Sequence, residues 1–229
     1  MEELIVLIVI IISILVLKIV FKANAKEIKD IANDKKLNDI TKTLPSNKEI
    51  CKTILKKLNN EDVEIEEEEN TNCFYFIATN KIILNKENSF FVRIQTIAHE
   101  CIHSIQDKKM LWFNYIFSNL LNLFFIILII IEITGVIQNT ILFAGIFLIL
   151  ILIQYSVRST LEINAMTKAK YLACEYLKEQ NIKETNEIAN KYEELNKAGI
   201  KYTCFQLLSS KLFMLFIYLI ISIILNFIK

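Results

Sequence analysis

Glycine and proline are scarce in this chain of 229 residues, which has 3 glycines and 1 proline. Flexible linkers and low-complexity tracts depend on such residues, so their scarcity argues against both. Five cysteines, an odd number without repeated spacing, do not form the pattern of a disulfide framework and suit a reducing compartment. The net charge of +1 lacks the positive surplus that phosphate binding requires, so we expect no nucleic acid as partner.

Apolar residues, in contrast, make up 54% of the chain, and the mean hydropathy is +0.41. They concentrate in four runs, at 4–21, 116–133, 136–157 and 212–228. Each run is about as long as a helix must be to cross ~30 Å of hydrocarbon. None has the polar face that a core helix of a soluble protein shows to water. The sequence therefore predicts a mainly α, integral membrane protein with about four transmembrane helices in a lipid bilayer.

Charged residues beside these runs predict how the chain crosses the membrane. The acidic start "MEE" precedes the first run, and Lys18 and Lys22 lie at its end, which favours a retained anchor over a cleaved signal peptide. Lys108 and Lys109 precede the second run, and Arg158 follows the third. Because positive charge favours the inner face, we expect the N-terminus outside and the long polar segments in the cytoplasm.

This topology divides the chain into five parts. We expect an N-terminal transmembrane anchor at 1–22, a cytoplasmic catalytic part at 23–110, a transmembrane hairpin at 111–157, cytoplasmic helices at 158–203, and a C-terminal transmembrane helix at 204–229.

Local patterns predict the elements of the polar parts. Irregular helical spacing of apolar residues predicts one helix near the membrane surface over 24–44, and "SNKE" at 46–49 reads as the capping box of the next helix. Alternating apolar and acidic residues start a small antiparallel meander over 62–85. A further helix is expected from Ser89 to about residue 107. Gly199 is expected to end a helix as its C-cap.

The segment "IAHECIHSIQ" at 97–106 holds the only two histidines of the sequence. His99 and His103 are four residues apart, so they share one helix face and can reach a single ion at about 2.0–2.1 Å. Glu100 points about 100° away, where it can take a proton from a water whose pKa a bound Zn²⁺ lowers. This is the pattern of zinc peptidases. The alternative is a structural histidine pair on a helix packed at the membrane surface. Cys101 points away from the histidines and is expected to be a small buried residue.

A catalytic zinc site usually has three protein ligands and one open position. Glu162 follows the predicted hairpin, which returns the chain to the side of the membrane where His99 and His103 lie. The residues alone leave two alternatives equal for Glu162: a third metal ligand, or a surface glutamate paired with Arg158 one turn earlier.

The sequence "HECIHSIQ", a membrane hairpin and then "LEINA" together resemble the family of "putative neutral zinc metallopeptidases" of bacterial membranes. This family typically has HExGHAIQ, two apolar helices and an EFNA-type segment. The resemblance implies one catalytic Zn²⁺ bound by His99, His103 and Glu162, with Glu100 as general base, in a zincin-like α+β catalytic part. It also implies a zinc metalloendopeptidase of the bacterial plasma membrane that hydrolyses membrane or membrane-proximal proteins.

The chain departs from this family pattern at several positions. Ile102 and Ser104 replace the usual glycine and alanine, and the DHYDPR-type stretch before the motif is not recognisable. Met166 stands where many related peptidases have an acidic residue that orients a histidine. The layout also resembles membrane proteases of the heat-shock and CAAX-processing type, which is one alternative. A catalytically silent membrane scaffold that retains the zinc site is another.

A peptidase must hold its substrate extended, which an edge strand near the site can do. The candidates are 74–78 and 81–84, and ordinary core strands are the alternative. Four further side chains are candidates for stabilising an oxyanion or for a second shell around the metal: Tyr155, Arg158, Tyr171 and Asn164.

Overall fold

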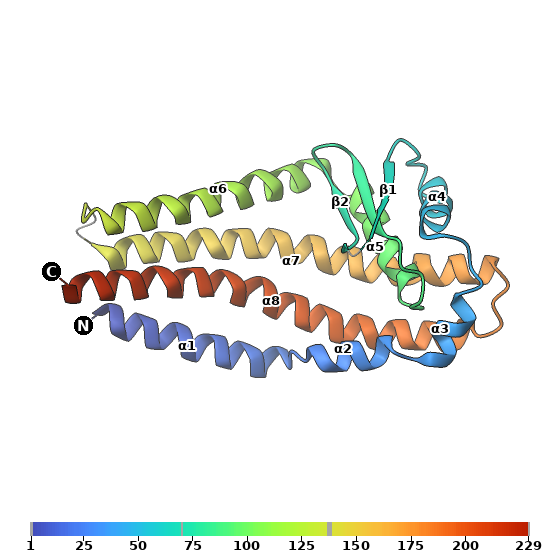
Figure 1. Ribbon diagram of the computed structural model, residues 1–229, viewed down its shortest axis with the longest axis horizontal. Coiled ribbons are helices and arrows are strands. Elements are labelled where there is room, and N and C mark those ends of the chain that lie inside the picture. Colours follow the sequence, from blue (N-terminus) through green and yellow to red (C-terminus); the bar gives the residue numbers. More distant parts are fainter. Residues whose placement is uncertain (1, 70, 137–138, 229) are drawn as a thin grey trace. The chain divides into compact units, whose positions relative to one another are not determined.

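A computed structural model describes residues 2–69, 71–136 and 139–228 (Figure 1). Contacts within the chain separate two compact units. The first, here called the helical unit, comprises Met1–Ala23, Phe113–Thr160 and Lys201–Lys229. The second, here called the site unit, comprises Asn24–Trp112 and Leu161–Ile200. The predicted outer turn at 134–140 includes residues 137 and 138, which lie outside the described residues.

The helical unit is built from α1 (Glu2–Phe21) and parts of α6 (Lys108–Ile133), α7 (Thr140–Glu179) and α8 (Thr185–Ile228). Each of these helices has a stretch that is long and apolar enough to cross a membrane. Many apolar side chains on their surfaces are exposed, as expected of helices whose outer faces contact lipid. The chain is thus mainly helical with four candidate membrane-spanning helices, as the sequence predicts.

A buried polar network connects all four helices of the helical unit. Glu132 of α6 is 6% exposed and accepts hydrogen bonds from Thr140 of α7 at 3.2 Å and from Tyr218 of α8 at 3.0 Å. The hydroxyls of Thr140 and Ser222 lie 3.1 Å apart, and Ser222 donates to Glu3 of α1 at 3.3 Å. A polar group in an apolar surrounding is costly unless it is hydrogen-bonded, so this network favours one arrangement of the helices.

The site unit begins with three short helices, α2 (Ala25–Ala32), α3 (Lys35–Thr41) and α4 (Asn47–Lys57). The prediction of a single helix over 24–44 is therefore wrong: Asn33 ends α2, and Asp34 caps the N-terminus of α3 by accepting from a backbone N–H. The predicted capping box is confirmed, because Ser46 and Glu49 bond each other's backbone N–H.

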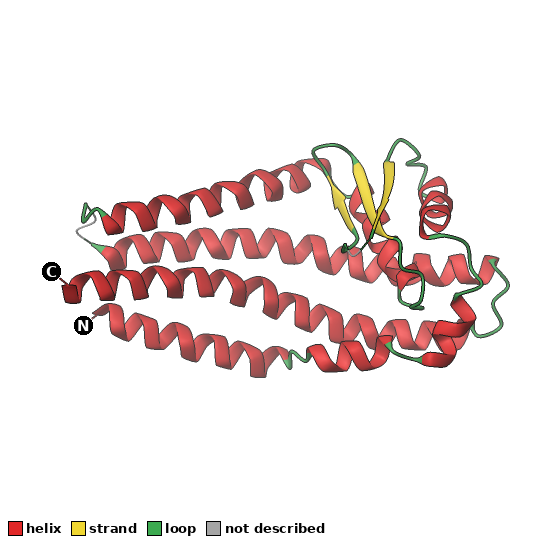
Figure 2. Cartoon of the chain, viewed as in Figure 1, coloured by secondary structure: helices red, strands yellow, loops and turns green. Residues whose placement is uncertain are grey.

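The sheet of the site unit consists of β1 (Glu64–Glu68), β2 (Phe74–Phe76) and β3 (Lys81–Asn85), shown as arrows in Figure 2. Its order is β1-β3-β2, with β1 parallel and β2 antiparallel to β3. The predicted antiparallel meander is therefore wrong, because the sheet is mixed. Ile82 and Leu84 of β3 are fully buried, so this most apolar strand occupies the centre, and β2, although earlier in the chain, forms the far edge.

Two predicted helix ends are also wrong. The helix with the histidine motif, α5, spans Arg93–Ile105, and Val92 rather than Ser89 precedes it, without a side-chain cap. Gly199 lies inside α8 and does not end it. A Cβ at position 199 would lie 2.7 Å from Cε of Met166, the flexible end of that side chain, so Gly199 packs against α7 within the site unit.

One hydrophobic cluster forms the core of the site unit. It joins α4, α5, the sheet and the parts of α7 and α8 in this unit. Ala165, Ala169 and Ala173 of α7 are fully buried in it. Small residues at this spacing let α7 pack closely against the other elements of this core. The same helix face carries Glu162 one turn before Ala165.

Candidate metal centre

The histidine motif lies on α5, and the other face of this helix is packed in the core of the site unit. Ile94, Ala98 and Cys101 are fully buried on its core face. At its N-terminus, the guanidinium of Arg93 is buried and donates to four oxygens of the segment from the end of α3 to the start of α4. This segment thereby fixes the start of α5, which has no side-chain cap of its own.

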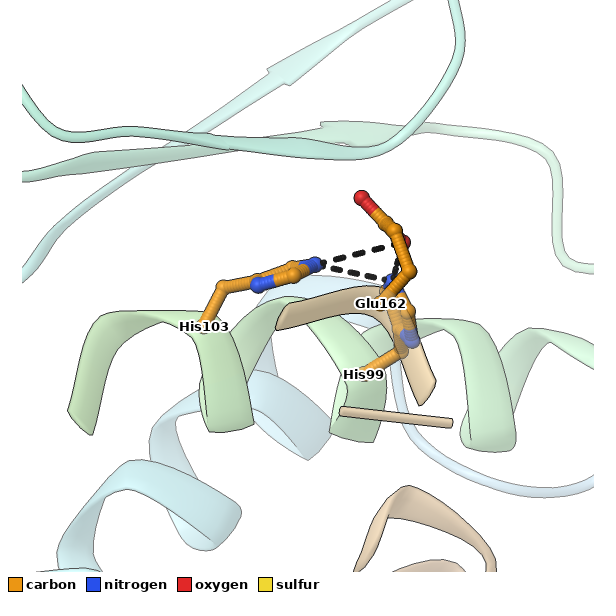
Figure 3. Close-up of side chains that lie close together, drawn as sticks. All are labelled: His99, His103 and Glu162. Atoms are coloured by element: carbon orange, nitrogen blue, oxygen red, sulfur yellow. Dashed lines mark hydrogen bonds and ion pairs between the residues drawn. The ribbon is translucent and has the colours of Figure 1, made fainter. Parts of the chain in front are cut away.

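Three side chains from α5 and α7 converge at one point, as Figure 3 shows. Nε2 of His99 lies 3.0 Å from Nε2 of His103. Oε2 of Glu162 lies 3.2 Å from Nε2 of His99 and 3.6 Å from Nε2 of His103. Ligands bound tetrahedrally to zinc at 2.0–2.1 Å are about 3.3 Å from one another. The two nitrogens and the carboxylate oxygen therefore fit a single zinc ion in both separation and chemistry.

Gln106 connects this cluster to α7. Its Oε1 lies 2.7 Å from Nδ1 of His103, and its Nε2 donates to the carbonyl of Leu161 at 2.8 Å and to Oδ1 of Asn164 at 3.1 Å. A carbonyl only accepts, so the amide group must turn its nitrogen to Leu161 and its oxygen to His103. His103 then carries its proton on Nδ1, which leaves the lone pair of Nε2 for a metal.

Glu100 lies beside the cluster and is 7% exposed. Its Oε2 accepts a hydrogen bond from the backbone N–H of Tyr75 in β2 at 2.7 Å. Burial raises the pKa of the Glu100 carboxyl above its ordinary value, although the two histidines and the Tyr75 N–H act against this shift. Among the described residues, no hydrogen bond reaches Oε1, which leaves this oxygen for a small polar molecule.

The pKa values of His103 and Cys101 are also shifted by their surroundings. Burial acts to lower the pKa of His103, but the hydrogen bond and the charge of Glu162 outweigh it and raise this pKa above its ordinary value. Cys101 is fully buried, as predicted, and its Sγ lies 3.6 Å from Sγ of Cys51 in α4. Burial and this contact raise the pKa of the Cys101 thiol.

The other sequence-predicted site residues lie as follows. Asn164 reaches the centre indirectly, through Gln106. Tyr171 is 64% exposed, lies about 13 Å farther along α7 than Glu162 and contacts Lys170 with its ring. Tyr155 and Arg158 belong to the helical unit. Gln106 was not among the predicted site residues. Its position one turn after His103, on the same helix face, is the signal that could have identified it.

The sheet presents one edge strand to the motif helix. β2 is an edge of the sheet, and its Tyr75 N–H points away from β3 toward Glu100. Of the two segments predicted as an edge strand near the site, 74–78 contains this strand. The prediction for 81–84 is wrong, because β3 is the central strand.

Comparison with protein families gives one match. The family described as "Putative neutral zinc metallopeptidase" matches residues 4–223, which confirms the resemblance noted in the sequence. A search of curated proteins and a search of solved structures found no match.

Proposed function

Because the chain belongs to the family of "putative neutral zinc metallopeptidases", we propose that it is a membrane-embedded zinc metalloendopeptidase that hydrolyses peptide bonds of membrane or membrane-proximal proteins. The observation that carries the proposal is the convergence of His99, His103 and Glu162 from two helices, with Glu100 beside them. A structural histidine pair does not require a carboxylate from α7 at the same point.

His99, His103 and Glu162 are the residues that would hold one Zn²⁺, each through the atom that faces the other two. When bound, the ion would lower the pKa of a water and polarise the carbonyl of the peptide bond. Three protein ligands leave one position open, as catalytic zinc sites require. The bond between Gln106 and His103 keeps Nε2 unprotonated and the ring in place for this role.

Glu100 is the general base of the proposed reaction. Its Oε2 is fixed by the Tyr75 N–H, so Oε1 is the oxygen that takes a proton from the attacking water. The same carboxyl then delivers this proton to the nitrogen of the leaving amine. Burial raises the pKa of Glu100, which brings its proton affinity closer to what transfer near neutral pH needs.

The edge strand β2 is the proposed position for the substrate. An extended peptide that pairs with the free edge of β2 adds to the sheet and runs past Glu100. The Tyr75 N–H stays bonded to Glu100, so the peptide pairs through the Tyr75 carbonyl, which faces the same edge by the alternation of strand backbones.

We further propose that the protein lies in a bacterial plasma membrane with its N-terminus outside and the centre on the cytoplasmic side. The support is the distribution of Lys and Arg beside the apolar runs. The division into an anchor, a catalytic part, a hairpin, a pair of polar helices and a final transmembrane helix, as given above, belongs to the same proposal.

Glu100→Gln tests this function. The amide keeps the size of the side chain but cannot accept the proton, so we expect cleavage of a model membrane protein to fall by at least about 100-fold, while bound zinc stays near the wild-type amount. Elemental analysis and a gel-based cleavage assay on the same preparation measure the two quantities. If zinc-loaded wild type cleaves no membrane protein or casein, the scaffold alternative replaces the peptidase.

A further inference from the structure

A concave groove lies between α4 and β1, at the edge of the sheet opposite β2. Its volume is about 360 Å³. Leu55, Val63 and Ile65 form its apolar part, and Lys48, Lys52 and Lys56 form its basic part. The groove is built entirely from the site unit and is separate from the metal centre.

The three lysines follow one face of α4 at intervals of one turn. Within the part of the chain that the structure describes, no carboxylate lies within ion-pair distance of any of them. Glu61 is the one acidic residue among those that line the groove. Some lysines of the site unit are paired, as Lys57 is with Glu179 at 2.6 Å and Lys81 with Glu66 at 2.9 Å. Unpaired lysines also occur elsewhere on the described surface, so the three groove lysines are set apart by their regular spacing along one helix face. The basic wall of the groove is therefore available to an anionic partner.

The other wall of the groove is a free strand edge. β1 pairs only with β3 in the described sheet. Glu64 donates its N–H to the carbonyl of Asn80, and Glu68 accepts from the N–H of Lys86, so the backbone of these two residues faces β3. By the alternation of strand backbones, the N–H and C=O groups of Ile65 and Glu67 face the groove.

We propose that this groove binds an extended segment of a partner protein that carries acidic side chains at every second position. Lysines four residues apart on a helix are about 6 Å apart along its axis. Alternate side chains of a strand, which share one face, are about 6.6–6.8 Å apart. A strand added to the edge of β1 therefore places one acidic side chain near each of Lys48, Lys52 and Lys56.

The position of α4 beside β1 supports this agreement between the lysine spacing and the strand spacing. The backbone N–H of Lys48, at the start of α4, donates to the side-chain carboxylate of Glu67, near the end of β1, at 2.9 Å. Only a short connection, residues 58–63, joins the end of α4 to the start of β1. The row of lysines and the free strand edge thus run side by side over the same length.

Two other occupants fit less well. A second copy of the chain, paired through its own β1, would bring Glu64, Glu66 and Glu68 of both copies to the same face, where like charges repel. An anionic lipid headgroup matches the lysines but offers no row of donors and acceptors for the backbone of β1. A peptide strand satisfies both walls.

Peptide binding to the full-length protein in detergent micelles tests the proposal. The protein carries Glu100→Gln so that the probe is not consumed, and the readout does not depend on cleavage. The probe is a fluorescent peptide of eight residues that alternates glutamate and threonine, followed by anisotropy. We expect saturable binding that weakens at least tenfold in Lys52→Glu/Lys56→Glu. The matched control is Lys29→Glu/Lys35→Glu, which makes the same charge change at two exposed lysines outside the groove and should bind as wild type.

Three results would overturn the proposal. Equal weakening in both double variants would show that only net charge matters. Equal binding of a peptide of the same composition, with its glutamates in one block, would exclude pairing along the strand. Absence of peptide binding, with binding to phosphatidylglycerol vesicles that depends on Lys52 and Lys56, would assign the groove to lipid. Failure of peptidase activity, in contrast, leaves this binding test unaffected.

Discussion

Oε1 of Gln106 lies 2.7 Å from Nδ1 of His103. The other end of the same amide is bonded to Leu161, the residue before Glu162. One side chain at the C-cap of α5 therefore orients His103, a proposed ligand, and contacts the turn of α7 that supplies Glu162, the third proposed ligand. Precise spacing of three ligands from two helices needs such a connection, because helix packing alone tolerates larger shifts.

Gln106→Ala should weaken zinc binding by about 10–100-fold, the range typical of residues that orient a ligating histidine. Asn164→Ala should weaken it less, because Gln106 keeps its bond to the Leu161 carbonyl. A chelator competition titration measures both affinities. Gln106→Glu retains an oxygen for His103 but loses the two donated bonds, so its affinity should fall between wild type and Gln106→Ala. An affinity for Gln106→Ala equal to wild type would contradict the role.

Glu162→Gln should lower zinc affinity at least about tenfold, since loss of a directly bound carboxylate costs no less than loss of an outer hydrogen bond. Glu175→Gln is the matched control, because Glu175 lies on the same helix, and its side chain is 61% exposed. Elemental analysis after dialysis against limiting zinc gives the metal content of each variant. Equal zinc in the two variants would remove Glu162 from the site.

Arg93→Met should lower the free energy of unfolding by about 3 kcal/mol. The guanidinium donates to the carbonyls of Thr41, Leu44 and Pro45 and to the amide of Asn47, and its loss leaves buried acceptors without partners. Thermal unfolding of the detergent-solubilised protein, followed by circular dichroism, reports the change. Exposed Lys35 gives the control: Lys35→Met should change stability by less than about 0.5 kcal/mol. A melting temperature for Arg93→Met as high as that of the control would be inconsistent with this role.

Cys51 and Cys101 should not react with a maleimide in the folded protein. Both are fully buried, and the pKa of Cys101 is raised above its ordinary value, so its thiolate fraction at any given pH is lower and becomes appreciable only at higher pH. The test uses a variant in which serine replaces Cys73, Cys174 and Cys204, with mass spectrometry before and after denaturant. Modification of either thiol at neutral pH without denaturant would show that the core between α4 and α5 opens.

The sequence by itself determined those features that depend on local pattern. Four long apolar runs imply helices that can span a membrane, and histidines four residues apart must share a helix face. The capping box at Ser46 and Glu49 and the buried position of Cys101 follow from neighbours within one element. Residue types and spacing alone carried the family resemblance, which the family comparison confirms.

Only the tertiary structure decided the features that depend on residues far apart in the chain. The order β1-β3-β2, with β1 parallel to β3, depends on pairing between strands that are not consecutive in the chain, although the apolar character of β3 fits its central position. Gly199 lies inside α8 and faces Met166 of α7, so a residue that resembles a helix end does not end one here. The approach of Glu162 to His99 likewise depends on how α7 packs against α5, because contacts between distant segments override local preference.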